Sequence, residues 1–235
     1  MGKVVLIGAG PGAADLITVR GARLLALADV VLHDALVSQE ILNLCPQAQK
    51  ILVGKRSGKQ STAQTEINAQ LVHYGLRHDL VVRLKGGDPM LFGRADEELA
   101  ELELANIEVE VVPGITTAFA AAAATLQPLT KRGCARSVAF FTSSSAPELP
   151  ATTQLPDCDT LVQYMGGQQA RQTAALLLAQ GRSPALPVIA IENCSLPNQR
   201  IQRLTLAQLA DGLTDCTGPV LVMIGKALEK RAPPL

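Results

Sequence analysis

The sequence is poor in aromatic residues and has no excess of either charge. It contains no tryptophan, two tyrosines and four phenylalanines, and its 21 basic residues balance 21 acidic ones. A chain without a net positive field has little to attract a polyanion, and few rings are available to stack on bases. We therefore expect no nucleic acid among its partners.

Long apolar runs are missing as well. Arg, Asp or Gly interrupts each long apolar stretch well before it reaches the ~20 residues that a membrane span needs. The first strand-like run begins at residue 3, without the pattern of a secretory leader. These features predict a cytoplasmic protein with no membrane segment.

Cysteine and histidine are too sparse to indicate a disulfide framework or a metal site. The five cysteines are odd in number and include no C-x-x-C pair, which argues against both disulfides and a zinc ribbon. The three histidines, His33, His73 and His78, could bind a metal together only if all of them converged. We expect reduced, mostly packed thiols and no metal.

Short apolar runs and helical stretches alternate along the chain, which predicts an α/β fold. Runs of strand length lie at 3–7, 30–33, 50–53, 80–84, 108–112, 137–141, 160–164, 187–191 and 219–224. Between them, residues 18–29 and 62–76 have apolar residues at helical spacing, with Thr18 and either Ser61 or Thr62 as candidate caps. Residues 116–125 form a small-residue helix.

The length of the chain allows one large α/β domain or two small ones, because 48% of its 235 residues are hydrophobic. Pro113-Gly114 is the best boundary between two domains. We therefore predict an N-terminal α/β domain over 1–113 and a C-terminal α/β domain over 114–235.

Glycine-rich and polar motifs follow nearly every predicted strand. They are GAGPG (8–12), Asp34, GKRSGK (54–59), KGGDP (85–89), PGIT (113–116), TSSS (142–145), MGG (165–167), ENCS (192–195) and GK (225–226). In parallel α/β sheets, ligands bind outside the carboxyl ends of the strands. We therefore expect parallel sheets with an active-site cleft between the two domains.

The first of these motifs has the pattern of a dinucleotide-binding turn. Glycines at 8, 10 and 12 precede Ala13, and Asp34 stands where a ribose-binding carboxylate would follow. In a dinucleotide site, however, the helix begins within the glycine turn, so that its free N–H groups meet the pyrophosphate. Here Pro11 interrupts the turn and helical spacing begins only near Thr18, which disfavours a nicotinamide enzyme.

The segment VVRLKGGDPMLFGR (81–94) is the most informative part of the sequence. It combines bare glycine backbone, the carboxylate of Asp88 and an apolar stretch from Met90 to Phe92. Such a loop suits a nucleoside with an organic tail. The structural alternative is an Asp-Pro turn in which Asp88 caps the helix that follows.

Six spaced blocks together resemble the uroporphyrinogen-III C-methyltransferases of the tetrapyrrole methylase superfamily. They are VGKRSG (53–58), VRLKGGDP with FGR (82–94), VVPGIT (111–116), PLTKR (128–132), YMG (164–166) and EN with QR (192–200). The resemblance implies two α/β domains, a homodimer, and transfer of methyl groups from S-adenosylmethionine to two carbons of uroporphyrinogen III. The products would be S-adenosylhomocysteine and precorrin-2, a precursor of sirohaem or cobalamin.

Two alternatives within the superfamily stay open. One is a methyltransferase that acts on a later corrin precursor, and the other is a weakly active paralogue that binds the donor or a tetrapyrrole.

The resemblance also implies roles by position. Asp34 matches the family's proposed proton acceptor, and Lys55 matches its proposed proton donor. The donor site would comprise Pro11, Gly86, Gly87, Asp88, Leu91, Thr116, Thr117, Met165 and Cys194. Because the substrate bears eight carboxylates, basic loop residues are candidate substrate contacts. They are Arg56, Arg94, Lys131 and Arg132, with Lys59 and Arg136 near them in the sequence.

The sequence departs from the family pattern at several positions. Ala35 follows Asp34 where many members have arginine, so a cation expected beside the acid is missing. GRADEE (93–98) replaces Gly-Arg-Gly-Gly-Glu-Glu, TSSS (142–145) replaces Thr-Gly-His, and Lys59-Gln60 replaces a Tyr-His pair. We expect donor binding to survive these changes and the effects to fall on substrate affinity, on rate or on the second methylation.

Overall fold

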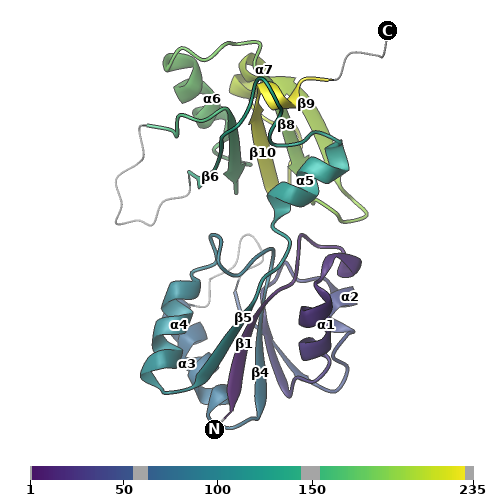
Figure 1. Ribbon diagram of the computed structural model, residues 1–235, viewed down its shortest axis with the longest axis vertical. Helices are drawn as coiled ribbons and strands as arrows, with labels where there is room; N and C mark the ends of the chain where they lie inside the picture. Colours follow the sequence, from purple (N-terminus) through teal and green to yellow (C-terminus); the bar gives the residue numbers. More distant parts are fainter. Residues whose placement is uncertain (1, 55–62, 144–153, 231–235) are drawn as a thin grey trace. The chain divides into compact units, whose positions relative to one another are not determined.

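The computed structural model describes residues 2–54, 63–143 and 154–230. The chain divides into two compact units, Met1–Thr116 and Thr117–Leu235. Each unit contains one five-stranded sheet with helices packed against it (Figure 1). The α/β class expected from the alternating pattern is therefore confirmed.

The sheet of the first unit is parallel throughout. Its strands are β1 (Lys3–Gly8), β2 (Val30–His33), β3 (Gln49–Leu52), β4 (Leu80–Lys85) and β5 (Glu108–Val112), in the order β3-β2-β4-β1-β5. The central strands β1 and β4 are buried along almost their whole length. This agrees with their nearly continuous apolar sequences, because both faces of a parallel sheet are covered by helices.

Helices cover both faces of this sheet (Figure 1). They are α1 (Val19–Leu25), α2 (Gln39–Leu42), α3 (Gln64–Gly75) and α4 (Ala95–Leu104), with the short 3-10 turn η1 (Ala14–Leu16) before α1. Leu25 and Ile41, from α1 and α2, share one core cluster, whereas Leu71 and Leu102, from α3 and α4, share another. The predicted cap of α1 is confirmed, since the Gly21 N–H donates to Thr18 Oγ1 at 3.1 Å.

The connections of this sheet produce a switch point between two neighbouring strands. The strands β2 and β4 pair directly, with His33 opposite Leu84. The chain then leaves β2 toward α2 on one face and leaves β4 toward α4 on the other. Crevices at such points, outside the carboxyl ends of the strands, are the usual ligand sites of open α/β sheets.

The second sheet is mixed, so the expectation of a parallel sheet is wrong for this unit. Its strands are β6 (Val138–Thr142), β7 (Thr160–Tyr164), β8 (Pro187–Glu192), β9 (Arg200–Thr205) and β10 (Val220–Gly225), in the order β6-β7-β10-β8-β9. Only β6 and β7 pair in parallel, and β10 runs antiparallel to both β7 and β8. The helices are α5 (Thr117–Thr125), α6 (Ala170–Ala179) and α7 (Leu206–Asp211), and the 3-10 turn η2 (Lys226–Leu228) follows β10.

The second sheet differs from the sequence-based expectation at two further points. The strand β9 was not expected, because its sequence RIQRLT lacks an apolar run and it lies at the edge of the sheet. Because β10 is antiparallel to β7 and β8, the Gly225-Lys226 motif lies at the opposite end of the strands from the loops that follow β6, β7 and β8.

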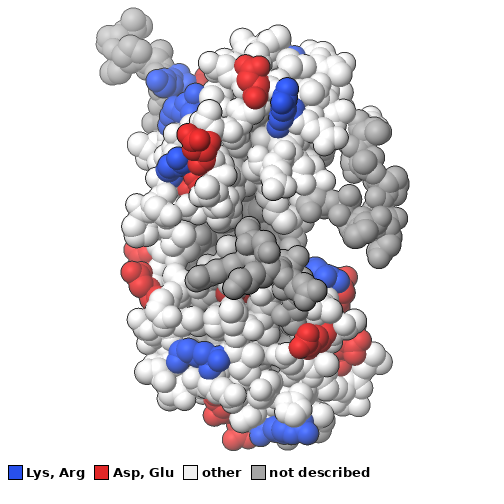
Figure 2. Space-filling model, turned by 180° about the vertical axis from the view of Figure 1, so that it is seen from behind, with Lys and Arg blue, Asp and Glu red and all other residues white. Residues whose placement is uncertain are grey.

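Charges of both signs are interspersed on the face shown in Figure 2, among a larger area of uncharged described residues. None of the helices in the described ranges combines the length and the hydropathy that a membrane crossing requires.

The first stability prediction concerns helix α3. Replacing the fully buried Leu71 with alanine should lower the free energy of unfolding of the first unit by about 2–5 kcal/mol, because it removes packed methyl groups and leaves a cavity. The exposed Leu76 at the end of the same helix is the control, and its alanine variant should change stability by less than about 0.5 kcal/mol. Urea unfolding measures both, and equal effects would contradict the assigned core.

Candidate active site

Three glycine-containing loops of the first unit meet at the carboxyl ends of its parallel strands, which we call the carboxyl edge. The Gly87 N–H donates to the Gly10 carbonyl at 2.7 Å, and the Gly10 N–H donates back to the Gly87 carbonyl at 3.2 Å. A Cβ atom on Gly8 would lie 2.5 Å from the Gly114 Cα, and one on Gly114 would lie 2.2 Å from the Gly87 carbonyl oxygen. Only glycine allows the loops after β1, β4 and β5 to approach this closely.

The same geometry explains the opening motif GAGPG. The chain passes from this turn through η1 and reaches α1 only at Val19, so no α-helix begins within the glycine turn. Gly8 and Gly10 serve the close approach of neighbouring loops, and the geometric objection to a dinucleotide site is confirmed.

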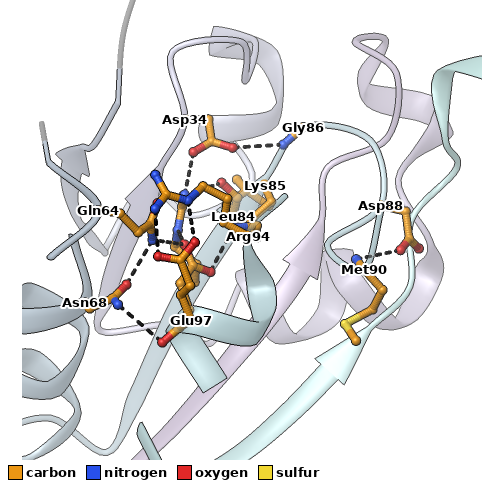
Figure 3. Close-up of polar contacts among 12 residues, drawn as sticks. Asp34, Gln64, Asn68, Leu84, Lys85, Gly86, Asp88, Met90, Arg94 and Glu97 are labelled. Atoms are coloured by element: carbon orange, nitrogen blue, oxygen red, sulfur yellow. Dashed lines mark hydrogen bonds and ion pairs between the residues drawn. The ribbon is translucent and has the colours of Figure 1, made fainter. Parts of the chain in front are cut away.

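Asp88 ties two of these loops together. Its Oδ2 accepts the Gly114 N–H at 2.9 Å, and its Oδ1 accepts the Met90 N–H at 2.9 Å (Figure 3). The Asp-Pro turn is therefore present, but Asp88 does not cap α4, whose N-cap residue is Arg94. The physical reason is distance along the chain, because five further loop residues separate Asp88 from Arg94.

The backbone around Gly86 and Gly87 is open. A Cβ on Gly87 would meet nothing within 4 Å, and one on Gly86 would meet only the Leu36 Cβ at 3.7 Å. The exposed side chains of Met90 and Phe92 follow in the same loop. Bare polar backbone beside exposed apolar side chains fits a flat, partly apolar ligand such as a nucleoside.

A cluster of four charged residues lies under this edge. Arg83 Nη2 is 2.6 Å from Asp34 Oδ1, and Arg83 Nε is 3.0 Å from Glu98 Oε1. Lys85 Nζ is 2.8 Å from Glu98 Oε2, and the second oxygen of Asp34 accepts the Gly86 N–H at 3.3 Å (Figure 3). The side chain of Glu98 is 0% exposed, those of Arg83 and Lys85 are 4% exposed, and that of Asp34 is 30% exposed.

The local sequence explains the placement of these charges. Residues 81, 83 and 85 of β4 alternate onto the face that α3 and α4 cover, and Glu98 faces them from the first turn of α4. Burial opposes the charge of Arg83, but the carboxylates of Asp34 and Glu98 outweigh it and raise the Arg83 pKa. Burial, followed by the neighbouring Arg83 charge, lowers the pKa of Lys85.

Sequence reasoning missed Arg83, and it expected no cation beside Asp34. The structure corrects this, because the cation comes from β4 instead of from position 35. Two basic residues within the otherwise apolar strand LVVRLK were the available signal.

The predicted substrate-binding residues lie in different places. Lys55 and Arg56 are outside the described residues. Arg94 is exposed and donates from Nε and Nη2 to the Glu97 carboxylate at 2.5 and 2.7 Å. Lys131 and Arg132 line a pocket of about 300 Å³ together with Gln127, Pro128, Thr130, Ala227 and Glu229. Ala227 and Glu229 follow the end of β10, so this pocket does not lie at the edge that carries Met165 and Cys194.

In the second unit, Glu192, Gln199 and Arg200 of the EN…QR block form a set of hydrogen bonds that we call the clamp. It holds the loop after β8 and the segment before β10. Glu192 Oε1 accepts the N–H groups of Thr217 and Gly218 at 2.7 and 2.6 Å, and its Oε2 accepts Arg200 Nε at 2.8 Å. The Ser195 N–H donates to Gln199 Oε1 at 2.8 Å. The bond from Gly218 is the largest cause of the lowered Glu192 pKa.

Left-handed backbone is concentrated in the motif loops. Phe92, Arg94, Met165, Asn193 and Ser195 all have φ between 51° and 64°. Each such non-glycine residue costs on the order of 1–3 kcal/mol and persists where its surroundings impose it, often at functional sites. The loops after β4, β7 and β8 are therefore held in specific conformations.

The remaining predicted residues accompany these loops. Thr116 is buried just before α5, Thr117 is the first residue of α5, and the exposed Met165 follows β7. Cys194 is buried, and burial raises its pKa to about 11. Its thiol is protonated at neutral pH and is therefore no nucleophile.

A parallel sheet with a carboxylate and open glycine backbone at its carboxyl edge, followed by a mixed sheet, defines a two-unit α/β protein with a surface suited to a nucleoside-type ligand. The family model described as Tetrapyrrole (Corrin/Porphyrin) Methylases matches residues 3–210. The chain belongs to this family, and the resemblance inferred from the six sequence blocks is confirmed.

Individual relatives agree with this assignment. The siroheme synthases of Actinobacillus pleuropneumoniae serotype 7 (strain AP76) and Zymomonas mobilis subsp. mobilis (strain ATCC 31821 / ZM4 / CP4) are each 43% identical to this chain. The matches cover 97% and 96% of this chain and 48% and 49% of those proteins. The chain thus spans about half the length of the curated relatives it matches.

Solved structures match over nearly the whole chain. The native uroporphyrin III C-methyl transferase of Thermus thermophilus has a TM-score of 0.86 and 36% identity, covering 99% of this chain and 98% of that one. The Thermus thermophilus enzyme complexed with S-adenyl homocysteine has a TM-score of 0.84 and 38% identity, covering 97% and 99%. The cobalt precorrin-4 methyltransferase CbiF, with 28% identity and a TM-score of 0.82, covers 97% and 96%.

Cysteine labelling tests the burial of Cys194. In the native protein at mildly alkaline pH, iodoacetamide should modify the exposed Cys134 and leave Cys194 unmodified, because Cys194 is buried and its pKa is raised to about 11. Peptide mass spectrometry measures each site. Equal labelling of the two cysteines in folded protein would contradict the structure.

The clamp predicts a pH dependence of stability. Because the folded-state pKa of Glu192 is lowered, its stabilisation is fully present above the ordinary glutamate pKa and is lost as the pH falls through the lowered value. Glu192→Gln should therefore be less stable than wild type at neutral pH, with the difference shrinking in acid. Urea midpoints over a pH series measure this, and a difference independent of pH would refute it.

Proposed function

We propose that this chain transfers methyl groups from S-adenosylmethionine to two carbons of uroporphyrinogen III and so produces precorrin-2 and S-adenosylhomocysteine. The observation that carries the proposal is the partly exposed, ion-paired Asp34 beside the open Gly86-Gly87 backbone. The Thermus thermophilus structures support it, since one of them holds the demethylated donor. The greater identity to these structures than to CbiF favours this substrate over a later corrin precursor. We further propose a homodimer, as the family resemblance implies, and a cytoplasmic location, as the sequence pattern predicts.

The family resemblance assigns donor-binding residues within each of the two units. In the first unit, Pro11, Gly86, Gly87, Leu91 and Thr116 contact the donor, and Asp88 holds two of their loops together. In the second, Thr117, Met165 and Cys194 contribute, with Cys194 acting through packing or backbone because its thiol stays protonated. The open glycine backbone and the exposed Met90 and Phe92 fit the adenosine part of such a donor.

When bound, the donor supplies an electrophilic methyl group on a positively charged sulfur. A pyrrole carbon of the substrate supplies the electron pair of the new carbon–carbon bond, and the electron pair of the broken sulfur–methyl bond stays on sulfur. The loops must therefore align the two reactants and exclude water. The methylated macrocycle then carries the positive charge, and it becomes neutral by losing a proton whose bonding electron pair stays in the ring system. The Asp34 carboxylate accepts this proton and, being partly exposed, passes it to solvent.

Basic side chains bind the acidic substrate. Arg94 presents an exposed guanidinium that exchanges Glu97 for a substrate carboxylate. Lys131 and Arg132 line a pocket away from the edge that carries Met165 and Cys194, and they are assigned to the substrate on the basis of sequence alone. Lys55, as proton donor, and Arg56 complete the proposal on the basis of sequence alone.

The Asp34→Asn variant tests the proton acceptor. Under anaerobic conditions with uroporphyrinogen III and S-adenosylmethionine, wild type should form a dimethylated tetrapyrrole together with S-adenosylhomocysteine. Asp34→Asn should lower kcat by about 10²–10⁴-fold, because asparagine cannot accept the proton. Mass analysis of the tetrapyrrole measures the product.

The control is Asp79→Asn, which changes an exposed carboxylate before β4 and should keep wild-type kcat. The absence of any methylated tetrapyrrole with the wild-type protein would refute the proposed function. Full activity of Asp34→Asn would refute the role of Asp34 alone.

A further inference from the structure

We infer that Arg83 is a positioning residue for Asp34, and that Glu98 in turn fixes Arg83. The inference rests on the proposed role of Asp34 as proton acceptor. Arg83 lies beneath the carboxyl edge with a side chain that is 4% exposed, so it acts through Asp34 and not on the substrate itself.

The guanidinium is fixed by all three of its nitrogens. Nη2 donates to Asp34 at 2.6 Å, Nε donates to Glu98 at 3.0 Å, and Nη1 donates to the Leu84 carbonyl at 3.3 Å. Because the guanidinium is planar, it cannot turn away from one partner without losing the others. Arg83 thereby holds Oδ1 of Asp34, while the Gly86 N–H donates to Oδ2 of Asp34 at 3.3 Å.

Glu98 is fixed as well. Its Oε1 accepts Arg83 Nε at 3.0 Å and Gln64 Nε2 at 3.4 Å, and its Oε2 accepts Lys85 Nζ at 2.8 Å. Gln64 also donates to Asn68 Oδ1 at 2.9 Å, and Asn68 donates to the Glu97 carbonyl at 3.2 Å (Figure 3). The position of Arg83 is thus set directly by α4 and β4, and α3 contributes through Glu98.

The balance of charges in this cluster bears on how Asp34 returns to its charged form after it has accepted a proton. Two cations, Arg83 and Lys85, match two carboxylates, Asp34 and Glu98, and Asp34 is the member of this set with substantial exposure. When Asp34 takes up a proton, the cluster is left with one uncompensated positive charge. Release of the proton to solvent restores the charge balance of the cluster.

A purely structural role for Arg83 would be to join β4 to α4 through Glu98. That role requires no contact with Asp34, which belongs to the loop after β2 at the exposed edge. The two roles therefore differ in one measurable property, namely whether the effect of changing Arg83 depends on the Asp34 carboxylate.

A double-mutant cycle between Arg83→Lys and Asp34→Asn measures this dependence. Lysine keeps the positive charge but cannot bond Asp34, Glu98 and the Leu84 carbonyl together. Arg83→Lys alone should lower kcat by roughly 10–100-fold with KM for both substrates unchanged, as expected for a misplaced catalytic group. In the Asp34→Asn background, the same change should have no further effect on kcat.

Glu98→Gln supplies a second variant that conserves shape, and it should show a smaller loss with the same dependence on Asp34. The control is Arg20→Lys, which alters an exposed arginine paired with Glu110 and should keep wild-type kcat. Thermal unfolding and calorimetric titration with S-adenosylhomocysteine establish that each variant is folded and binds the demethylated donor.

The outcomes separate the inference from the proposed function. Losses that multiply in the double variants, or full activity of Arg83→Lys and Glu98→Gln, would overturn the positioning role while the proposed function stands. A wild-type protein that forms no methylated tetrapyrrole would overturn both.

Discussion

The contact between the Arg83 guanidinium and the Asp34 carboxylate is the interaction on which the rest of the proposed site depends. A buried arginine is costly unless it is paired and fully hydrogen-bonded, so its presence in the central strand β4 requires partners on every side. Glu98 reaches it from α4, and Lys85 balances Glu98. The exposed end of this arrangement is Asp34, at the point where β2 and β4 send the chain to opposite faces of the sheet. The strand β4 therefore belongs to the centre of the sheet and also carries two charged residues of the candidate site, Arg83 and Lys85.

A second constraint is the closeness of the glycine loops above this cluster. A Cβ added to Gly8 or to Gly114 would collide with the backbone of a neighbouring loop, and Asp88 holds the loops after β4 and β5 together by hydrogen bonds. The backbone at Gly86 and Gly87 consequently stays open at the surface. In the proposed reaction, rate enhancement comes mainly from holding donor and substrate in line, and rigid loops serve that purpose.

Much of the first unit could be predicted from its sequence, because both periodicity and motifs carried strong signals there. The apolar runs of β1, β2, β4 and β5 and the cap at Thr18 matched the structure. The second sheet was harder, since strand direction is decided by pairing between distant segments and β9 is too polar to be recognised. Likewise, the spacing that marked Asp34 could not reveal Arg83, whose partnership arises only when β2 and β4 pair. The EN…QR block was noticed as a motif, but its clamp on Thr217 and Gly218 joins segments far apart in the sequence.

The central claim is that Asp34, held by Arg83, removes a proton after the methyl group has been transferred. A single-turnover experiment that follows S-adenosylhomocysteine and the finished tetrapyrrole separately, in wild type and in Asp34→Asn, addresses it most directly. The account predicts that the variant forms S-adenosylhomocysteine at close to the wild-type rate while the tetrapyrrole product appears far more slowly. Equal slowing of both events, or no slowing of either, would contradict it.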